Sequence, residues 1–126
     1  MGSDDEPEPL DWSFQGRSGA DLHKAIHPNS NFKRCILEEA DLTEANFEGS
    51  DFSRAAMRGT NLMKSNFDNC DFRGADLRGI DFRGCRMDGV SLANAKISGC
   101  YFPPSIPAEE ILLSVSHGTR LRDQAQ

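Results

Sequence analysis

Large apolar residues recur at every fifth position through most of this 126-residue chain. The series has fifteen members without a gap: Phe32, Leu37, Leu42, Phe47, Phe52, Met57, Leu62, Phe67, Phe72, Leu77, Phe82, Met87, Leu92, Ile97 and Phe102. A period of five fits neither the α-helix, with about 3.6 residues per turn, nor the plain β-strand, with a period of about two. It therefore predicts short straight edges joined by tight corners, with one large side chain of each edge pointing inward.

Three other positions of the five-residue unit repeat together with the large residue. The residue two before it is small or medium in every unit except the one that contains Ile80. The residue directly before it is often Asp or Asn, and the residue two after it is often Gly. Gly and Asn tolerate the positive φ that tight corners need. One unit cannot bury its own apolar pair, so stacked coils must form the core, as they do in a solenoid.

Units such as ADLTE (40–44), SNFDN (65–69) and CDFRG (70–74) resemble the pentapeptide-repeat family, whose unit is written A(D/N)Lxx. The resemblance covers about residues 20–102. It implies an all-β fold, a right-handed quadrilateral β-helix in which four units make one coil and residue n stacks on residue n+20. The tract then holds about four coils, and at ~4.8 Å between hydrogen-bonded strands it is ~20 Å tall.

We expect three segments along the chain. Residues 1–19 are rich in Asp, Glu and Pro and are predicted to form a flexible acidic tail, although Trp12 and Phe14 are in phase with the repeats and could cover the first coil. Residues 20–102 form the β-helix, with an irregular first coil where His27 and Pro28 break the pattern. Residues 103–126 contain a short C-terminal helix and a tail.

The C-terminal helix is predicted to have Ser105 as its N-cap and to end at His117-Gly118. The last coil of a solenoid exposes its core and needs a cap. The apolar stripe of the helix therefore either caps the β-helix or forms the seam of a homodimer, and the chain is expected to be a monomer or a homodimer through this helix. The stripe comprises Ile111, Leu112 and Val115.

The cysteines and histidines do not form a pattern typical of catalysis or metal binding. All four cysteines occupy the small inward position, and none lies twenty residues from another: Cys35, Cys70, Cys85 and Cys100. We expect them to be free thiols in the core of a protein from a reducing compartment, the cytoplasm. The chain has no CxxC pair, and His23 and His27 fall on different edges. We therefore predict that the protein is not an enzyme and has no catalytic residues, metal site or cofactor.

Outward positions are the candidates for function. One column contains an acidic ladder, and another column is partly basic: the candidate partner-facing residues are Glu48, Asp68, Asp88, Arg58 and Arg78. We predict a non-catalytic protein-interaction or scaffold module that binds another, unidentified protein. The net charge of −6 argues against direct nucleic-acid binding. We also expect neither a secretory signal nor a membrane span, since there is no apolar run of about 18 residues.

The family resemblance implies an alternative function. Qnr-like and MfpA-like members look like B-DNA to DNA gyrase and topoisomerase IV. B-DNA carries one negative charge per ~1.7 Å of its axis, so a ~20 Å rod would need on the order of a dozen net negative charges. Residues 20–102 contain 12 acidic and 11 basic residues, a net charge of −1. This disfavours a full mimic and leaves one-sided mimicry through the acidic ladder as the alternative.

Overall fold

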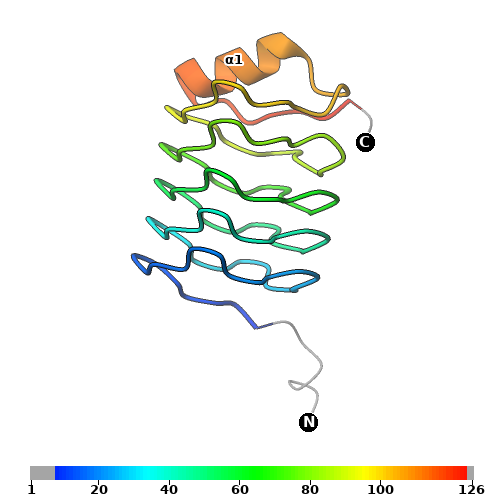
Figure 1. Ribbon diagram of the computed structural model, residues 1–126. Helices are drawn as coiled ribbons and strands as arrows, with labels where there is room; N and C mark the ends of the chain where they lie inside the picture. The colour runs from blue at the N-terminus through cyan, green and yellow to red at the C-terminus, as the bar shows by residue number, and fades with distance from the viewer. Residues whose placement is uncertain (1–7, 125–126) are drawn as a thin grey trace.

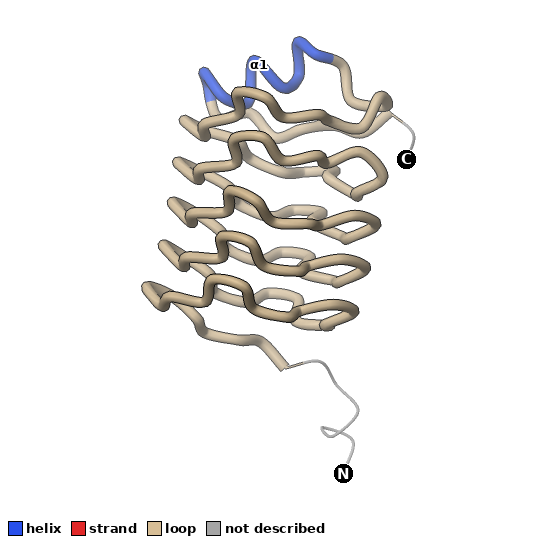
Figure 2. Tube along the Cα trace, in the orientation of Figure 1, coloured by secondary structure: helices blue, strands red, loops and turns tan. Residues whose placement is uncertain are grey.

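The computed structural model describes residues 8–124 of the chain, which form a stack of similar coils (Figure 1). Isolated parallel bridges join residues twenty apart, from Asp11↔Asn31 to Asp81↔Tyr101. The single helix of the described residues, α1 (Ala108–His117), lies over the last coil, and no bridge extends into a longer strand (Figure 2). The predicted stacking of residue n on residue n+20 is confirmed by these bridges. No helix in residues 8–124 is long and apolar enough to cross a membrane.

Most units turn their corner in the same way. The N–H three residues after the large residue donates to the carbonyl of that residue, as Cys35 does to Phe32 at 2.9 Å. The residue before this donor has positive φ, 57° at Arg34. The Asp or Asn that precedes the large residue accepts the N–H two residues further on, as Asp51 does from Ser53 at 2.8 Å. The repeated acidic and amide side chains therefore hold the corners.

The interior of the stack is filled by large side chains that lie over one another. All of the fifteen predicted core residues are buried except Ile97 and Phe102, which are partly buried in the last coil. The rings of Phe32 and Phe52 are stacked with centroids 4.7 Å apart, and those of Phe52 and Phe72 with centroids 5.1 Å apart. Such aromatic pairs contribute about 0.5–1.5 kcal/mol beyond their burial.

The stack begins earlier than the predicted boundary at residue 20. Asp11 and Gly16 already bridge to residues twenty further on, and residues 1–7 of the predicted tail lie outside the described residues. The ring of Trp12 lies edge-on to Phe32 with centroids 5.9 Å apart, and the guanidinium of Arg17 lies 4.1 Å from the Trp12 centroid. The boundary was missed because Arg17 occupies a large-residue position, which is apolar in every unit from Phe32 to Phe102. It covers Trp12 at the open end of the stack.

The first coil is regular, which corrects the expectation of an irregular one. His27 takes a large-residue position there, and its Nδ1 lies 2.6 Å from the carbonyl oxygen of Glu8. An imidazole fits because this end of the stack is open to polar partners. Phe14, in contrast, is 69% exposed and does not cover the coil.

Helix α1 packs on the last coil with a different face from the predicted one. It begins after Pro107, which makes no side-chain cap hydrogen bond, so the prediction of Ser105 as N-cap was wrong. Ile111 is buried and Val115 packs against the core, but Leu112 is 63% exposed. Residues three and four apart share a helix face, so the face of Ile111 also contains position 114 and excludes position 112.

Ser114 replaces Leu112 in the contact with the last coil. Its side chain is fully buried, and its Oγ accepts the N–H of Leu92 at 2.8 Å. The segment that follows α1 adds a second contact that we did not predict. Arg120 forms an antiparallel bridge with Ser91, and Leu121 is 1% exposed. The cap is therefore a helix together with an antiparallel segment, and the homodimer seam remains a prediction.

Candidate interaction surface

The partly basic column surrounds a depression of about 420 Å³ on the outer surface. Its walls carry charged side chains and its floor is glycine: Glu38, Glu39, Arg58, Gly59, Arg78 and Gly79. The positive φ of Gly59 and Gly79, both 78°, places them at successive corners of one column. The hollow lies where successive corners of this column, at positions 59, 79 and 99, lack a side chain, and the carboxylate of Glu39 lies against Gly59.

The two arginines of this depression are held differently. Arg78 is tied to Asp76, with Nε 2.9 Å from Oδ1 and Nη2 2.7 Å from Oδ2. This hydrogen bonding holds the pKa of the Asp76 carboxyl below its ordinary value. The guanidinium of Arg58 is exposed and forms no hydrogen bond or ion pair with the residues that the structure describes, although the backbone carbonyl of Arg58 accepts the N–H of Glu39. One guanidinium is thus fixed in direction, and the other is available for a partner.

The acidic ladder does not present three free carboxylates. Asp68 was predicted to face water, and this was wrong because its residue is only 5% exposed. Nε and Nη2 of Arg86 lie 3.0 and 2.8 Å from its Oδ2, and the N–H of Asp88 donates to its Oδ1 at 2.8 Å. The long Arg86 side chain lies across the carboxylate and covers it, which the positions of the acidic residues alone could not indicate.

The two ends of the ladder are less covered than its centre. Asp88 is partly buried, and its Oδ1 accepts the N–H of Asp123 at 2.9 Å, which ties the C-terminal segment to the stack. Glu48 is exposed, and its Oε1 lies 3.3 Å from Nδ2 of Asn66. Glu48 and Arg58 are therefore the two exposed members of the predicted partner-facing set, and they lie on separate columns.

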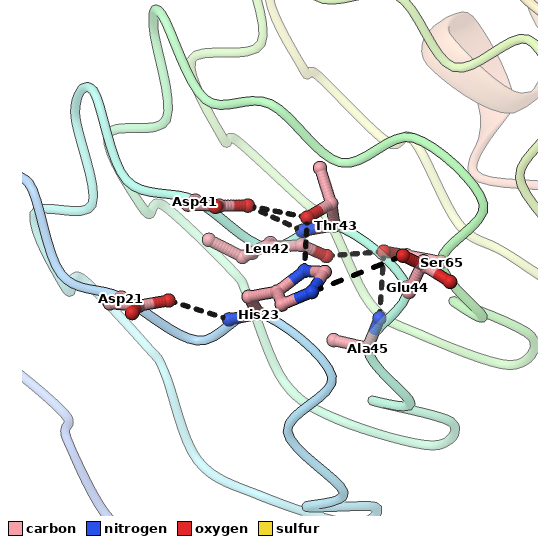
Figure 3. A network of polar contacts seen from close by, with 8 residues as sticks. All are labelled: Asp21, His23, Asp41, Leu42, Thr43, Glu44, Ala45 and Ser65. Atoms are coloured by element: carbon pink, nitrogen blue, oxygen red, sulfur yellow. Dashed lines mark hydrogen bonds and ion pairs between the residues drawn. The ribbon is translucent and has the colours of Figure 1, made fainter.

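A polar network that the sequence analysis did not identify joins two neighbouring coils (Figure 3). Nδ1 of His23 lies 2.6 Å from Oγ1 of Thr43, and Nε2 of His23 lies 4.0 Å from Oε2 of Glu44. The Thr43 hydroxyl donates to Oδ1 of Asp41 at 2.7 Å, and this hydrogen bond lowers the pKa of the Asp41 carboxyl. The register of twenty places residue 43 on residue 23, which is the signal that could have revealed the contact.

The network contains a hydroxyl, an imidazole and a carboxylate, but its hydrogen bonds do not activate a nucleophile. A nucleophilic hydroxyl donates its proton to the base. Here the proton of Thr43 is directed to Asp41, so Nδ1 of His23 is the donor in the contact with Thr43. The side chains of His23 and Glu44 are 41% and 48% exposed. The arrangement is that of a solvent-exposed polar link between two coils.

The cysteines are free thiols whose hydrogen bonds follow the register. Cys70 and Cys85 are buried, and each Sγ lies 3.0 Å from a carbonyl oxygen of the preceding coil, that of Phe47 and of Leu62 respectively. Burial raises the pKa of Cys85 to about 11. Within residues 8–124, no group of three or more His, Cys, Asp or Glu side chains could hold a metal ion.

Comparison with known proteins found one matching family model and several similar solved structures. The family model described as the pentapeptide repeat region matches residues 24–102. Rfr23, a pentapeptide repeat protein from the cyanobacterium Cyanothece 51142, is 24% identical with a TM-score of 0.57. That match covers 79% of this chain and 65% of Rfr23, so the chain spans less than two thirds of the length of that protein. The likeness shows a shared fold.

Two further solved structures are similar at lower scores. A pentapeptide repeat protein from the thylakoid lumen of Arabidopsis thaliana is 23% identical with a TM-score of 0.43, covering 94% of this chain and 86% of that one. A trypsin-treated variant of QnrB1, a plasmid-mediated fluoroquinolone resistance protein, is 22% identical with a TM-score of 0.48, covering 76% and 61%. A search of curated proteins found no match.

Proposed function

This chain belongs to the pentapeptide-repeat family, and we propose that it is a non-catalytic protein-interaction module of the cytoplasm. In this proposal the coils form a right-handed, four-sided β-helix of about four coils, whose repeated interior supplies rigidity. The outward side chains, which differ from coil to coil, supply specificity. The partner is another protein.

The single observation that carries the proposal is the depression around Arg58. It offers one guanidinium held by Asp76 and one exposed guanidinium, above a floor of two glycines. Arginine forms strong, directional pairs with carboxylates and is enriched in protein interfaces. A partner segment that carries a carboxylate could therefore pair with Arg58, while Glu38 and Glu39 would repel a second negative charge nearby.

The charged lining of this depression also supports a role in binding rather than catalysis. Enzyme pockets are usually concave, largely apolar cavities with a few convergent polar groups. Here four of the six lining residues are charged and the other two are glycines. The proton of Thr43 is directed away from His23, so the polar network lacks an activated hydroxyl as well.

The test is affinity capture with the full chain as bait, from an extract of the cells that produce it. We compare the wild type with Arg58→Glu, and with Lys24→Glu as a matched control, because Lys24 is exposed on another column. We expect a protein that binds the wild type and Lys24→Glu at equal levels and binds Arg58→Glu at least about tenfold less. Equal binding to Arg58→Glu would contradict the proposal that the depression around Arg58 is the binding surface. The absence of any bound protein would contradict the proposal that the chain is a protein-interaction module.

Mimicry of DNA towards DNA gyrase and topoisomerase IV remains the second candidate. Its supporting observation is the exposed carboxylate of Glu48, with Asp88 further along the same column. The pairing of Asp68 with Arg86 weakens it, because the centre of the ladder is then neutralised. A gyrase supercoiling assay, with and without a quinolone, separates the candidates. Inhibition or protection by the full chain that is lost in Glu48→Lys would favour mimicry, and no effect at micromolar protein would exclude it.

A further inference from the structure

One column of small inward residues contains two β-branched side chains in succession. This column runs through Ala40, Thr60, Ile80 and Cys100, and Ile80 is its largest member. Both Thr60 and Ile80 are buried, with 8% and 2% of their surface exposed. Val90, in another column, follows Cys70, and the bridge between Asp71 and Ser91 beside it is intact. A single bulky residue is therefore tolerated, whereas Thr60 and Ile80 require more space between two coils.

The backbone ladder is interrupted at this same place. Asp41 bridges to Asn61 and Asp81 bridges to Tyr101, but between Asn61 and Asp81 the described chain has no bridge. Four N–H groups that would span the two coils make no hydrogen bond to any described residue: those of Gly59, Leu62, Lys64 and Asp81.

The corresponding groups one coil earlier are all paired. The N–H groups of Glu39, Leu42 and Glu44 donate to carbonyls of the next coil at 3.1, 2.7 and 2.9 Å. The N–H of Asn61 donates to Ala40 at 3.1 Å. The gap is thus specific to one pair of coils and one corner, and is not a general feature of the stack.

The hydroxyl of Thr60 is a second, independent sign of the gap. It is buried and has no hydrogen-bond partner within the described residues. The matched polar atoms in other units do have one: Ser65 Oγ donates to the carbonyl of Leu42, and Cys85 Sγ lies 3.0 Å from the carbonyl of Leu62. Buried polar groups without partners are rare and mark places where native packing is least favourable.

We propose that the corner formed by residues 59–64 and 79–84, which we name the Thr60–Ile80 seam, is a built-in opening point of the solenoid. The side chain of Ile80 against Thr60 holds the two coils apart at this corner, so the ladder has four fewer hydrogen bonds to break there. Local openings occur where few bonds hold the backbone. The seam reaches the surface at Gly59 and Gly79, two of the residues that line the depression, so its opening changes the shape of that surface.

Native-state amide hydrogen exchange of the full chain tests the seam in the wild type. After correction for intrinsic rates, we expect the amides of Gly59, Leu62, Lys64 and Asp81 to exchange at least about tenfold faster than their counterparts one coil earlier, Glu39, Leu42, Glu44 and Asn61. Urea at low concentration should increase the exchange rates of the seam amides less than those of the other amides, since opening of the seam exposes little surface. Protection within about twofold of the counterparts would overturn the seam.

The variant Ile80→Ala tests whether Ile80 is the wedge. It places at position 80 the residue found at position 40, where the ladder is intact. We expect protection of Leu62 and Asp81 to rise at least about tenfold, even if the new cavity lowers global stability. Val90→Ala, a similar loss of volume beside an intact ladder, should leave the ratio of seam to counterpart protection unchanged.

A second variant covers the case in which Ile80→Ala does not fold. Thr60→Ser removes the γ-methyl group and leaves a hydroxyl that can reach the carbonyl of Leu37, as Ser65 reaches that of Leu42. It should raise the protection of the same two amides. Unchanged protection in the variants that fold would overturn the role of the Thr60–Ile80 contact.

Discussion

Asp68 stands at an outward position of the repeat and yet behaves as a buried carboxylate. It accepts hydrogen bonds from Arg86 and from the N–H of Asp88. Hydrogen bonds to charged groups contribute about 1.5–3 kcal/mol, so Asp68→Ala is expected to lower the free energy of unfolding by about 2 kcal/mol. Glu48→Ala, in the same column but exposed, should change it by no more than about 0.5 kcal/mol. Urea denaturation of both variants measures the difference, and equal effects would contradict the burial of Asp68.

The buried thiols make the protein sensitive to alkali. Burial raises the pKa of Cys35 and Cys85 to about 11, and raises that of Cys70 further. In the unfolded chain these thiols ionise near their ordinary pKa of about 8.5, while the folded state keeps them protonated. Their contribution to stability is therefore complete below pH ~8.5 and is lost as the pH rises towards about 11, by up to about 1.4 kcal/mol per pH unit and thiol.

The measurement is the free energy of unfolding in urea, followed from pH 8 to pH 10.5 (roughly the range in which only the unfolded thiols ionise). Cys85→Ser provides the control, because a serine at the equivalent position 65 donates to a carbonyl in the same way. Its slope against pH should be smaller than that of the wild type. Identical slopes would mean that Cys85 ionises as freely in the folded protein as in the unfolded one.

At the scale of the element, the corner is the unit that the chain repeats. The free-energy cost of adding a side chain to a corner glycine depends on which residue of the neighbouring coil is stacked on it. Gly79 and Gly89 have φ of 78° and 76°, but a Cβ on Gly79 would meet nothing within 4 Å, while one on Gly89 would collide with the amide of Asn69. Gly79→Ala should therefore lower the free energy of unfolding by about 1 kcal/mol, the cost of positive φ for an L-residue. Gly89→Ala should lower it by about 2 kcal/mol or more.

The collision can be separated from the backbone cost by a double variant. In an Asn69→Gly background the short amide side chain is absent, so Gly89→Ala should cost no more than Gly79→Ala does in the wild type. Thermal or urea denaturation of the four proteins gives the coupling between the two positions. If Gly79→Ala and Gly89→Ala cost the same, stacked corners do not constrain one another.

The contact between α1 and the last coil depends on Ser114. Its buried Oγ accepts the N–H of Leu92, so Ser114→Ala leaves that N–H without a partner and should cost about 1–2 kcal/mol. Ser116 is the matched control because its hydroxyl is exposed and bonds within the helix, to the carbonyl of Leu112 at 2.9 Å. Ser116→Ala should change the free energy of unfolding by no more than about 0.5 kcal/mol. A loss at Ser116 as large as at Ser114 would contradict the proposed docking of the helix.

At the scale of the whole molecule, the interior could be predicted from the sequence because the buried position recurs every five residues. Each large residue, such as Leu42 or Leu62, is required by the same local geometry, so a period of five defines both the coil and its core. The small inward column was predictable for the same reason, and Ile80 already stood out in it. Family resemblance added the four-sided cross-section that periodicity alone does not define.

What could not be predicted lies where one residue meets another outside the register. Asp68 is covered by Arg86, which is eighteen residues away and therefore outside the register of twenty. The periodic pattern of the sequence does not indicate the direction in which a long side chain such as that of Arg86 extends. Leu121 closes the last coil from a segment without repeats. Leu112 was assigned to the packed face because apolar character was the only available signal, whereas a hydrogen bond to Leu92 places Ser114 there instead. The surface on which function depends is therefore less predictable than the core.

The end of the stack provides a test of the whole architecture. Leu92 and Val90 are fully buried beneath α1 and the segment around Leu121. A chain that ends at Phe102 would expose these side chains together with unpaired backbone groups, and such edges associate. Light scattering should therefore give the truncated chain a higher mass than the full chain.

The same experiment distinguishes a cap from a homodimer seam. If α1 formed the seam, its removal would lower the mass of the particle. Leu112→Asp in the full chain sharpens the comparison, because Leu112 is 63% exposed on the outer side of α1 and contributes nothing to the cap. We expect this variant to keep the mass and the unfolding midpoint of the full chain. A fall in mass for either variant would mean that the outer face of the helix joins two copies, and the capping contact of Ile111 and Ser114 would then serve to orient that face.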